Sequence, residues 1–220
     1  NGERIGLTFT EIKSPTESSI LMYRDDVADL TIAPEDVDEQ YIADLKTVSL
    51  SPDSIARHHD MKIVYTPIHG TGVRIIPQAL GAYGFTNIIH VPEQDVVSGD
   101  FPTVVSPNPE EPAALSMAVG KARETGAELV LASDPDSDRV GAAVKNDVGE
   151  WVLINGNQAV VLFVYYLLTR WEELGRLSGR EYIVKTIVTT ETVRAIAERR
   201  GVEMYDVYTG FKWIAEVMRR

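Results

Sequence analysis

The sequence predicts an α/β protein with mixed, mostly parallel sheets and helices on both faces, built as one complete and one partial domain. Hydrophobic residues make up 44% of the 220 residues, which is enough to form a core. Short apolar runs typical of strands alternate with longer stretches of helical spacing. This order favours parallel strands joined by right-handed crossovers, with ligands at the carboxyl ends of the strands.

Apolar residues at spacings of three and four predict the helices, and apolar runs bounded by turn residues predict the strands. Apolar and polar residues alternate only weakly in residues 1–35, so we interpret this segment as a tail or the remnant of a preceding domain. Residues 36–148 are expected to form the complete domain. Its elements are helices at 36–48, 52–59, 73–83 and 113–125, strands at 61–65, 87–91, 128–132 and 140–144, and a loop at 92–112.

The pattern stops and restarts near residues 147–150, where a hairpin turn or a domain junction is expected. The third division, residues 149–220, predicts helices at 157–174 and 191–200, strands at 182–188 and 202–207, and a last helix opened by residues 209–212. The sequence contains the first strands and helices of this second α/β unit but not a complete set. We therefore expect it to be the partial domain.

Charge and composition limit the partners of the chain. The net charge of −12, from 33 acidic and 21 basic residues, argues against a nucleic-acid or anionic-membrane surface. The longest apolar run, residues 159–168, is well short of the roughly 20 residues that span a bilayer. The absence of cysteine excludes disulfides and thiolate metal sites and fits a cytoplasmic protein. No signal peptide or initial Met is visible, so we expect a fragment of a longer protein.

Three carboxylates, Asp134, Asp136 and Asp138, occupy a loop between two predicted strands. A straight strand would space such residues by roughly 6.6 Å, and a helix would turn the middle one away, but a curled loop gathers all three. Two carboxylates about 4 Å apart repel by roughly 4 kcal/mol at an effective dielectric constant of about 20. A gathered trio therefore needs a cation or a proton, and ligands that are all oxygen favour Mg²⁺ or Mn²⁺.

Other interpretations of this loop stay open, apart from one. An Asp-rich turn could splay its acids into water. An EF-hand calcium loop fails, because Arg139 stands where Gly is needed at position 6 and Lys145 where the bidentate Glu is needed at position 12. Arg139 suits bidentate phosphate binding, which together with a metal indicates phosphoryl chemistry, although an Arg after acids is also typical of a surface ion pair.

A second loop is expected at the same edge of the sheet. It contains His69, Gly70 and Gly72 and follows the strand at 61–65, as the aspartate loop follows the strand at 128–132. Its glycines are typical of a tight strand-to-helix turn, and less often of a phosphate cradle.

These residues resemble the α-D-phosphohexomutase family, of the phosphoglucomutase and phosphopentomutase type, over residues 36–220. Asp134-Pro135-Asp136-Ser137-Asp138-Arg139 matches the family's Mg²⁺ loop position by position. The resemblance implies that the three acids bind the metal and that Arg139 is catalytic. Further matching runs occur in the family's order, at 66–72, 99–102, 107–110 and 155–158. Lys185 and the segment containing Thr209, Gly210 and Lys212 resemble substrate-binding segments on the sugar side of the cleft.

The resemblance implies a reversible transfer of phosphate between the C1 and C6 (or C5) hydroxyls of one sugar. An enzyme phosphoserine would act as donor, with Mg²⁺ or Mn²⁺ as cofactor and a bisphosphate of the glucose 1,6-bisphosphate type as intermediate or activator. The sequence lacks the family's Ser-His-Asn-Pro loop, of which Ser106-Pro107-Asn108-Pro109 is a partial echo, and its Gly-Glu-x-Ser motif. The resemblance therefore implies the second domain and part of the third, inactive alone, with a phosphosugar and the remaining domains as partners.

Several alternatives remain at this point. The sugar could be a glucose, mannose or pentose phosphate. The acids are also compatible with a metal-dependent phosphatase, a nucleotide-binding α/β domain or a non-catalytic interaction module. Lys185 is compatible with an edge-strand charge, and Thr209 with the N-cap of the last helix.

Overall fold

The computed structural model describes residues 7–14, 17–23 and 34–219, and the chain divides into two compact units, Asn1–Ser49 and Leu50–Arg220. In the first unit, β1 (Leu7–Ser14) and β2 (Glu17–Tyr23) pair antiparallel, and α1 spans Pro34–Thr47. The expected tail thus contains a hairpin. The helix predicted at 36–48 begins at a proline, which suits a first helical turn.

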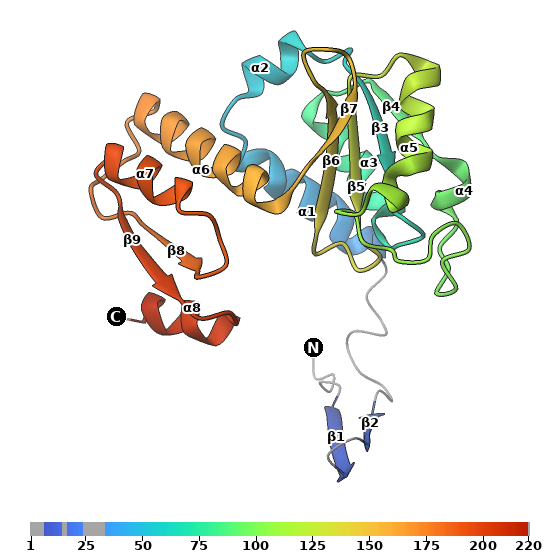
Figure 1. The fold of residues 1–220 in the computed structure, drawn as a ribbon, viewed down its shortest axis with the longest axis horizontal. Coiled ribbons are helices and arrows are strands. Elements are labelled where there is room, and N and C mark those ends of the chain that lie inside the picture. Colours follow the sequence, from blue (N-terminus) through green and yellow to red (C-terminus); the bar gives the residue numbers. More distant parts are fainter. Residues whose placement is uncertain (1–6, 15–16, 24–33, 220) are drawn as a thin grey trace. The chain divides into compact units, whose positions relative to one another are not determined.

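Among the described residues of the second unit, β4-β3-β5-β6-β7 form one five-stranded sheet (Figure 1). The strands are β3 (Lys62–Thr66), β4 (Asn87–His90), β5 (Leu129–Ser133), β6 (Val140–Lys145) and β7 (Trp151–Ile154). Strand β3 pairs parallel with β4 and β5, whereas the β5–β6 and β6–β7 pairs are antiparallel. The predicted mixed sheet is confirmed, although only half of its pairings are parallel. A crossover needs about a dozen residues, so the short link at 134–139 forces an antiparallel return.

Helices cover both faces of this sheet, as predicted (Figure 1). The chain moves from β3 through α3 (Gly72–Tyr83) to β4, and then back through α5 (Pro112–Thr125) to β5 on the other side of β3. Two right-handed crossovers in opposite directions place their helices on opposite faces. Helix α2 spans Pro52–Arg57, shorter than the expected 52–59.

The stretch at 92–112 was expected to be a loop, and its beginning is instead the short helix α4 (Pro92–Asp95). The amide groups of Gln94 and Asp95 donate to the carbonyl of Val91, which closes one turn. Pro92 supplies the fixed φ that a first helical turn requires. A single turn of this length leaves no hydrophobic period in the sequence, so periodicity could not reveal it.

Small residues on α5 build the main core. Ala114, Ala118 and Ala122 recur every fourth residue and are fully buried with Val64 and Val130 of the sheet. A spacing of four keeps them on one face of the helix, and their short side chains allow close approach to the strands. Strands β3 and β5, at whose carboxyl ends the His69 loop and the aspartate loop begin, are therefore held by a well-packed core.

Strand β7 was not predicted. The expected turn at 147–150 is a hairpin, in which Asn146 donates to the carbonyl of Glu150 and Gly149 adopts a φ of 83°. Strand β7 then pairs with β6 in the same sheet, so the expected division at 148/149 falls inside the hairpin. The sheet ends at Ile154.

The remaining residues form the second α/β module that the sequence predicted. It contains α6 (Gly156–Glu173), β8 (Tyr182–Thr186), α7 (Thr192–Arg199), β9 (Glu203–Val207) and α8 (Phe211–Met218). Asn155 and Gln158 form a capping box at the start of α6. In the part of the chain that the structure describes, β8 and β9 make a two-stranded parallel sheet over a small core of Leu168, Ala197 and Val202.

In residues 7–14, 17–23 and 34–219, no helix combines the length and the apolar character needed to cross a membrane.

Candidate metal centre

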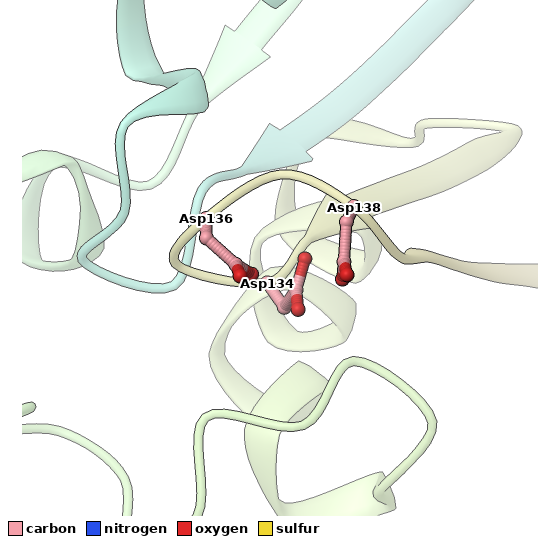
Figure 2. Close-up of side chains that lie close together, drawn as sticks. All are labelled: Asp134, Asp136 and Asp138. Atoms are coloured by element: carbon pink, nitrogen blue, oxygen red, sulfur yellow. The ribbon is translucent and has the colours of Figure 1, made fainter. Parts of the chain in front are cut away.

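The three aspartates predicted to act together do lie together. Asp134 follows the last residue of β5 and is fully buried, while Asp136 and Asp138 are exposed. One oxygen from each carboxylate lies within 4.8 Å of the others, and the side chains of Asp136 and Asp138 lie on either side of that of Asp134 (Figure 2). The three acids are therefore gathered and not splayed apart, although Asp136 and Asp138 remain exposed to water. Their role as metal ligands remains a prediction.

A tight turn curls this loop. The amide of Ser137 donates to the carbonyl of Asp134 at 3.0 Å, and Ser137 adopts a left-handed φ of 62°. Such a conformation is uncommon for a residue other than glycine. It reverses the chain between Asp136 and Asp138, so residues that would be spread along a strand converge.

Arg139 closes the loop on Asp134. Its backbone amide donates to Oδ1 of Asp134 at 2.9 Å, and its Nε donates to Oδ2 at 2.8 Å. Nε also lies 3.6 Å from Oδ1 of Asp138. The Arg139 side chain is nevertheless 55% exposed, so the ion pair holds one edge of the guanidinium while the remainder faces solvent. Both sequence interpretations of Arg139 thus have a structural counterpart, an ion pair and an exposed edge suited to an oxyanion.

Opposing effects act on the acids. Burial alone would raise the pKa of the Asp134 carboxyl, but the hydrogen bonds that Arg139 donates, together with those shared with Asp136 and Asp138, outweigh burial and lower this pKa. The pKa of Asp138 is raised, first by its hydrogen bond to Asp134 and then by the charge of Asp136. The loop therefore retains a proton on its exposed side more readily than an isolated aspartate does. A cation in place of that proton would relieve the same repulsion.

The donor set fits a hard cation. Mg²⁺ holds oxygen ligands at about 2.1 Å in octahedral geometry, so two oxygens are about 3.0 Å apart when adjacent and about 4.2 Å apart when opposite. The three carboxylate oxygens, which lie within 4.8 Å of one another, would move closer around the ion, and rotation of the exposed Asp136 and Asp138 side chains can supply this movement. Ligands that are all carboxylate oxygen favour Mg²⁺ or Mn²⁺ over softer metals.

The loop that contains His69 shares this edge of the sheet, as predicted. The amide of Thr71 donates to the carbonyl of Pro135 at 2.9 Å, which joins the two loops directly. His69 is buried with its Nδ1 2.8 Å from the carbonyl of Val96 and its Nε2 2.8 Å from Oγ1 of Thr103. Both ring nitrogens are thus occupied, and His69 anchors its loop to residues 96–103.

The glycines of this loop permit close packing. A Cβ on Gly70 would lie 2.3 Å from Cα of Pro135, and one on Gly72 would lie 2.5 Å from the hydroxyl of Tyr65. Real Cβ atoms do not approach so closely, so both positions require glycine. This supports the interpretation as a tight turn, while contact with a phosphate stays untested.

The loop at 107–110 reaches the same edge. A Cβ on Gly141 of β6 would lie 2.3 Å from the carbonyl oxygen of Pro109, so the loop packs directly on that strand. Ser106 Oγ donates to the Glu111 carboxylate at 2.9 Å, which occupies this hydroxyl structurally. Two of the runs with family-like sequence, 66–72 and 107–110, therefore contact the aspartate loop or the strand that follows it.

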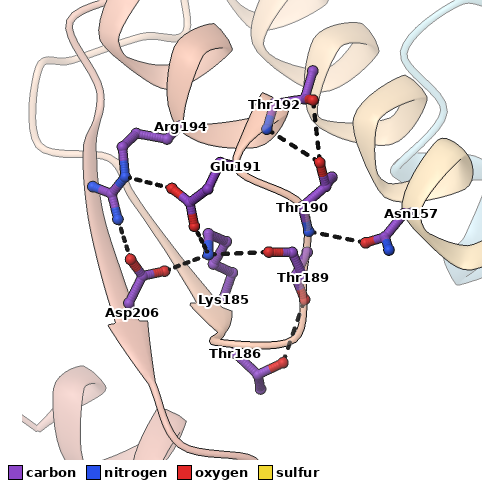
Figure 3. A network of polar contacts seen from close by, with 9 residues as sticks. All are labelled: Asn157, Lys185, Thr186, Thr189, Thr190, Glu191, Thr192, Arg194 and Asp206. Carbon is purple, nitrogen blue, oxygen red and sulfur yellow. Dashed lines mark hydrogen bonds and ion pairs between the residues drawn. The ribbon is translucent and has the colours of Figure 1, made fainter.

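Lys185 lies in the second module, at the carboxyl half of β8, and is only 5% exposed. Its Nζ lies 2.6 Å from Oδ1 of Asp206, 2.8 Å from Oε1 of Glu191 and 3.2 Å from the carbonyl of Thr189 (Figure 3). Arg194 pairs with the second oxygen of both carboxylates and closes a ring of alternating charges. Lys185 is thus a charge on an edge strand, since β8 has one neighbouring strand in its described sheet, but it is a buried one, and all three N–H donors of its ammonium are engaged.

The N-cap of α8 is not the residue that one sequence alternative named. Gly210, with a φ of 124°, occupies the N-cap position, so Thr209 is not the N-cap. The amide of Trp213 donates to the carbonyl of Gly210 at 3.1 Å, and Lys212 Nζ lies 4.9 Å from the centre of the Trp213 ring. This φ is unfavourable for a residue with a Cβ, which explains why the cap is glycine.

Comparison with known proteins gives a consistent result over most of the chain. Residues 39–149 match the model of the phosphoglucomutase/phosphomannomutase α/β/α domain II, and residues 155–220 match domain III of the same family. The boundary between the two matches coincides with β7 and with Asn155, the N-cap of α6.

Named relatives are sugar phosphate mutases. The chain is 35% identical over 182 residues to a phosphopentomutase of Homo sapiens, covering 81% of this chain and 30% of that protein. It is 33% identical over 183 residues to a phosphoglucomutase of Staphylococcus saprophyticus, covering 83% of this chain and 32% of that protein. The chain thus spans about a third of the length of these relatives.

Solved structures share the fold. A phosphomannomutase-like protein from Thermus thermophilus matches with a TM-score of 0.64 and 24% identity, covering 84% of this chain and 39% of that one. An N-acetylphosphoglucosamine mutase of Aspergillus fumigatus, solved with GlcNAc-6P and magnesium, matches with a TM-score of 0.51 and 14% identity, covering 73% of this chain and 33% of that one.

Proposed function

Because the chain belongs to the phosphoglucomutase/phosphomannomutase family, we propose that it supplies the Mg²⁺-binding loop and part of the sugar cleft of a phosphosugar mutase. In the whole protein, a phosphoserine donates its phosphoryl group to a free hydroxyl of a sugar monophosphate, which gives a bisphosphate. The sugar then returns its other phosphoryl group to the serine, so phosphate has moved between C1 and C6, or C5. The convergence of three carboxylates within 4.8 Å carries this proposal.

The residues of the aspartate loop have separate roles in this proposal. Asp134, Asp136 and Asp138 hold the metal, which neutralises phosphate charge when bound. Arg139, fixed along one edge by Asp134, presents its exposed edge to a phosphate oxygen. In this proposal the charged groups are in position before the substrate binds, and phosphoryl transfer is catalysed mainly by such preorganised charges.

The second module is proposed to supply the sugar side of the cleft through Lys185, Thr209, Gly210 and Lys212. Of these, Lys185 makes three polar contacts, so a direct contact with substrate requires Glu191 or Asp206 to release one donor. Glu191 is the more exposed of the two carboxylates, 67% against 31%, so its ion pair with Lys185 would break more easily than that of Asp206.

The proposal also assigns the parts of the chain. Residues 36–148, extended by β7, form the metal-binding domain, residues after Ile154 belong to the sugar-side domain, and residues 1–35 are the remnant of a preceding domain. The relatives act on different sugars by name, so the substrate is proposed only as a class, a pentose or hexose monophosphate.

A titration of the chain with Mn²⁺ tests the metal assignment. We expect wild type to bind one ion, and Asp136→Ala to lose most of that affinity. Asp147→Ala is the matched control, since it removes an exposed acid from the β6–β7 turn, outside the aspartate loop. Equal binding by wild type and Asp136→Ala would exclude the loop as the metal site.

An assay of the full-length protein tests the reaction class. Glucose 1-phosphate and ribose 1-phosphate are supplied with Mg²⁺ and a bisphosphate activator, and both isomer formation and inorganic phosphate are measured. A mutase converts the isomer without releasing phosphate, whereas a metal-dependent phosphatase releases phosphate. Phosphate release without isomerisation would replace the proposal by the phosphatase alternative.

A further inference from the structure

The aspartate loop alone does not explain how its geometry is kept. Three acids that converge repel one another, and Pro135 and Ser137, which separate them, are not core residues. Contacts inside the loop, from Ser137 and Arg139 to Asp134, curl it, but its attachment to the rest of the domain comes from neighbouring elements. Two hydroxyl side chains of the β3–α3 segment contact the loop at its beginning and near its tip, namely Tyr65 and Thr71.

Tyr65 contacts the residue immediately before the first acid. Its hydroxyl lies 2.8 Å from Oγ of Ser133, and the exposed fractions of Tyr65 and Ser133 are 1% and 4%. Burial raises the pKa of Tyr65 to about 12, so the hydroxyl keeps its proton. This hydrogen bond fixes the end of β5 and therefore the point from which Asp134 projects.

Gly72 lies against the same pair. A Cβ on Gly72 would approach the Tyr65 hydroxyl to 2.5 Å and Ser133 Oγ to 2.7 Å. The start of α3 therefore covers the Tyr65–Ser133 hydrogen bond and excludes a side chain from above it. A neutral buried pair that is covered in this way is costly to break, because each buried hydroxyl would lose a hydrogen-bond partner.

Thr71 contacts the loop between the first and second acids. Its amide and its Oγ1 both donate to the carbonyl of Pro135, at 2.9 and 3.1 Å, and Oγ1 lies 3.4 Å from Oγ of Ser137. Pro135 lacks an amide hydrogen, so its carbonyl is the backbone group by which another segment can hold it. Thr71 thus ties the loop near Asp136 to the N-terminus of α3.

We propose that Tyr65 and Thr71 are positioning residues that set the spacing of Asp134, Asp136 and Asp138 from the β3–α3 segment. This inference rests on the proposed metal site. Neither residue touches the ion in this proposal; Tyr65 acts through Ser133, and Thr71 through Pro135. Removal of groups that orient metal ligands typically weakens metal binding by about 10- to 100-fold.

Isothermal titration with Mn²⁺ on single variants of the chain tests the proposal. Tyr65→Phe removes only the hydroxyl, and Thr71→Val removes Oγ1 while keeping the shape and the amide donor. We expect about 10-fold weaker Mn²⁺ binding for each. Thr71→Ser keeps a hydroxyl and is expected to stay within about 2-fold of wild type. The electron paramagnetic resonance spectrum of bound Mn²⁺ should broaden in the two weakened variants, as the ligand geometry becomes less uniform.

The chain offers a matched control for Tyr65→Phe. Tyr166 also makes a tyrosine–serine hydrogen bond of 2.8 Å, to Oγ of Ser51, at an exposed position on α6. Tyr166→Phe should leave Mn²⁺ affinity unchanged. Circular dichroism at each titration temperature confirms that every variant is folded, and if Tyr65→Phe does not fold, the Thr71→Val and Thr71→Ser pair decides the proposal.

The outcomes separate this inference from the proposed function. Wild-type affinity in Asp136→Ala would refute the metal site itself. Loss in Asp136→Ala, with Tyr65→Phe and Thr71→Val indistinguishable from Tyr166→Phe, would refute only the positioning role. A Thr71→Ser variant as weak as Thr71→Val would also refute it, since the hydroxyl would not be the group that matters.

Discussion

Gly70 and Pro135 come so close that a Cβ on Gly70 would stand 2.3 Å from Cα of Pro135 and 2.7 Å from its carbonyl oxygen. The atoms that a Cβ would meet belong to the backbone, which cannot turn aside as a flexible side chain can. The contact joins the turn after β3 to the aspartate loop after β5. The two loops therefore cannot move independently.

Gly70→Ala should consequently push the two loops apart. We expect a loss of about 1–3 kcal/mol in the free energy of unfolding, as for other overpacked sites, together with weaker Mn²⁺ binding. Gly120→Ala is the control, because Gly120 lies in α5 with open space around its Cα. That variant should gain roughly 0.5–1 kcal/mol, since alanine is the better helix former. Urea unfolding measures both, and a neutral Gly70→Ala would contradict the contact.

Arg139→Lys should lower mutase activity in the full-length protein while leaving the fold intact. Lysine keeps the charge but lacks Nε and the planar fork, so the contact with Asp134 and the exposed edge cannot both be kept. We expect kcat to fall by about tenfold or more, as for loss of a charged contact in phosphoryl transfer. Arg123→Lys, at an exposed position on α5, is the control. Unchanged turnover in Arg139→Lys would count against a catalytic role.

The buried ammonium of Lys185 should make stability depend on alkaline pH. The hydrogen-bonded ion pair with Asp206, and next that with Glu191, raises the pKa of Lys185 above its ordinary value of 10.5. A raised folded-state pKa contributes stability that is complete below about pH 10.5 and is lost as the pH rises through the folded-state value. Lys185→Met should therefore be less stable than wild type at pH 8 and decline less steeply above pH 10.5.

Thermal unfolding between pH 8 and 11.5 measures this difference. Lys121→Met, which removes a partly exposed lysine from α5, serves as the control and should follow the wild-type decline. Parallel curves for wild type and Lys185→Met would show that the Lys185 pairings do not contribute to stability.

Hydrogen exchange should be faster in the second module than in the domain built on the five-stranded sheet. In the described residues, β8 and β9 form a two-stranded sheet over a small core, whereas β3 to β7 form a larger sheet packed against α5. Two strands alone give few amides that are both bonded and buried. Amides in residues 182–219 should therefore exchange faster than those in residues 61–146, and the opposite order would contradict this division of stability.

The sequence by itself determined much of the site. Three acids at alternate positions between two apolar runs identified the loop, and the βα order placed it beside the loop of His69. Both predictions rely on local information, because hydrophobic period and turn residues act within a few positions of one another. The same information gave most of the helices and strands, but it missed α4 and β7 and placed the division between the domains at 148/149, inside the β6–β7 hairpin.

Only the tertiary structure decided what each residue contacts. The pairing direction of β5 and β6 and the addition of β7 depend on which strands meet, although the short link at 134–139 was a signal for the first. Tyr65 and Ser133 are 68 positions apart, and Thr71 and Pro135 are 64 apart. Nothing in the period of a strand or helix links residues at such separations. The sequence offered Lys185 as an edge-strand charge or a sugar ligand, and only the structure shows that it is buried between Glu191 and Asp206, because the crossover from β8 to β9 brings those carboxylates to it. Burial and pairing are properties of the packed chain, and a sequence pattern reports only which side chains are able to take part.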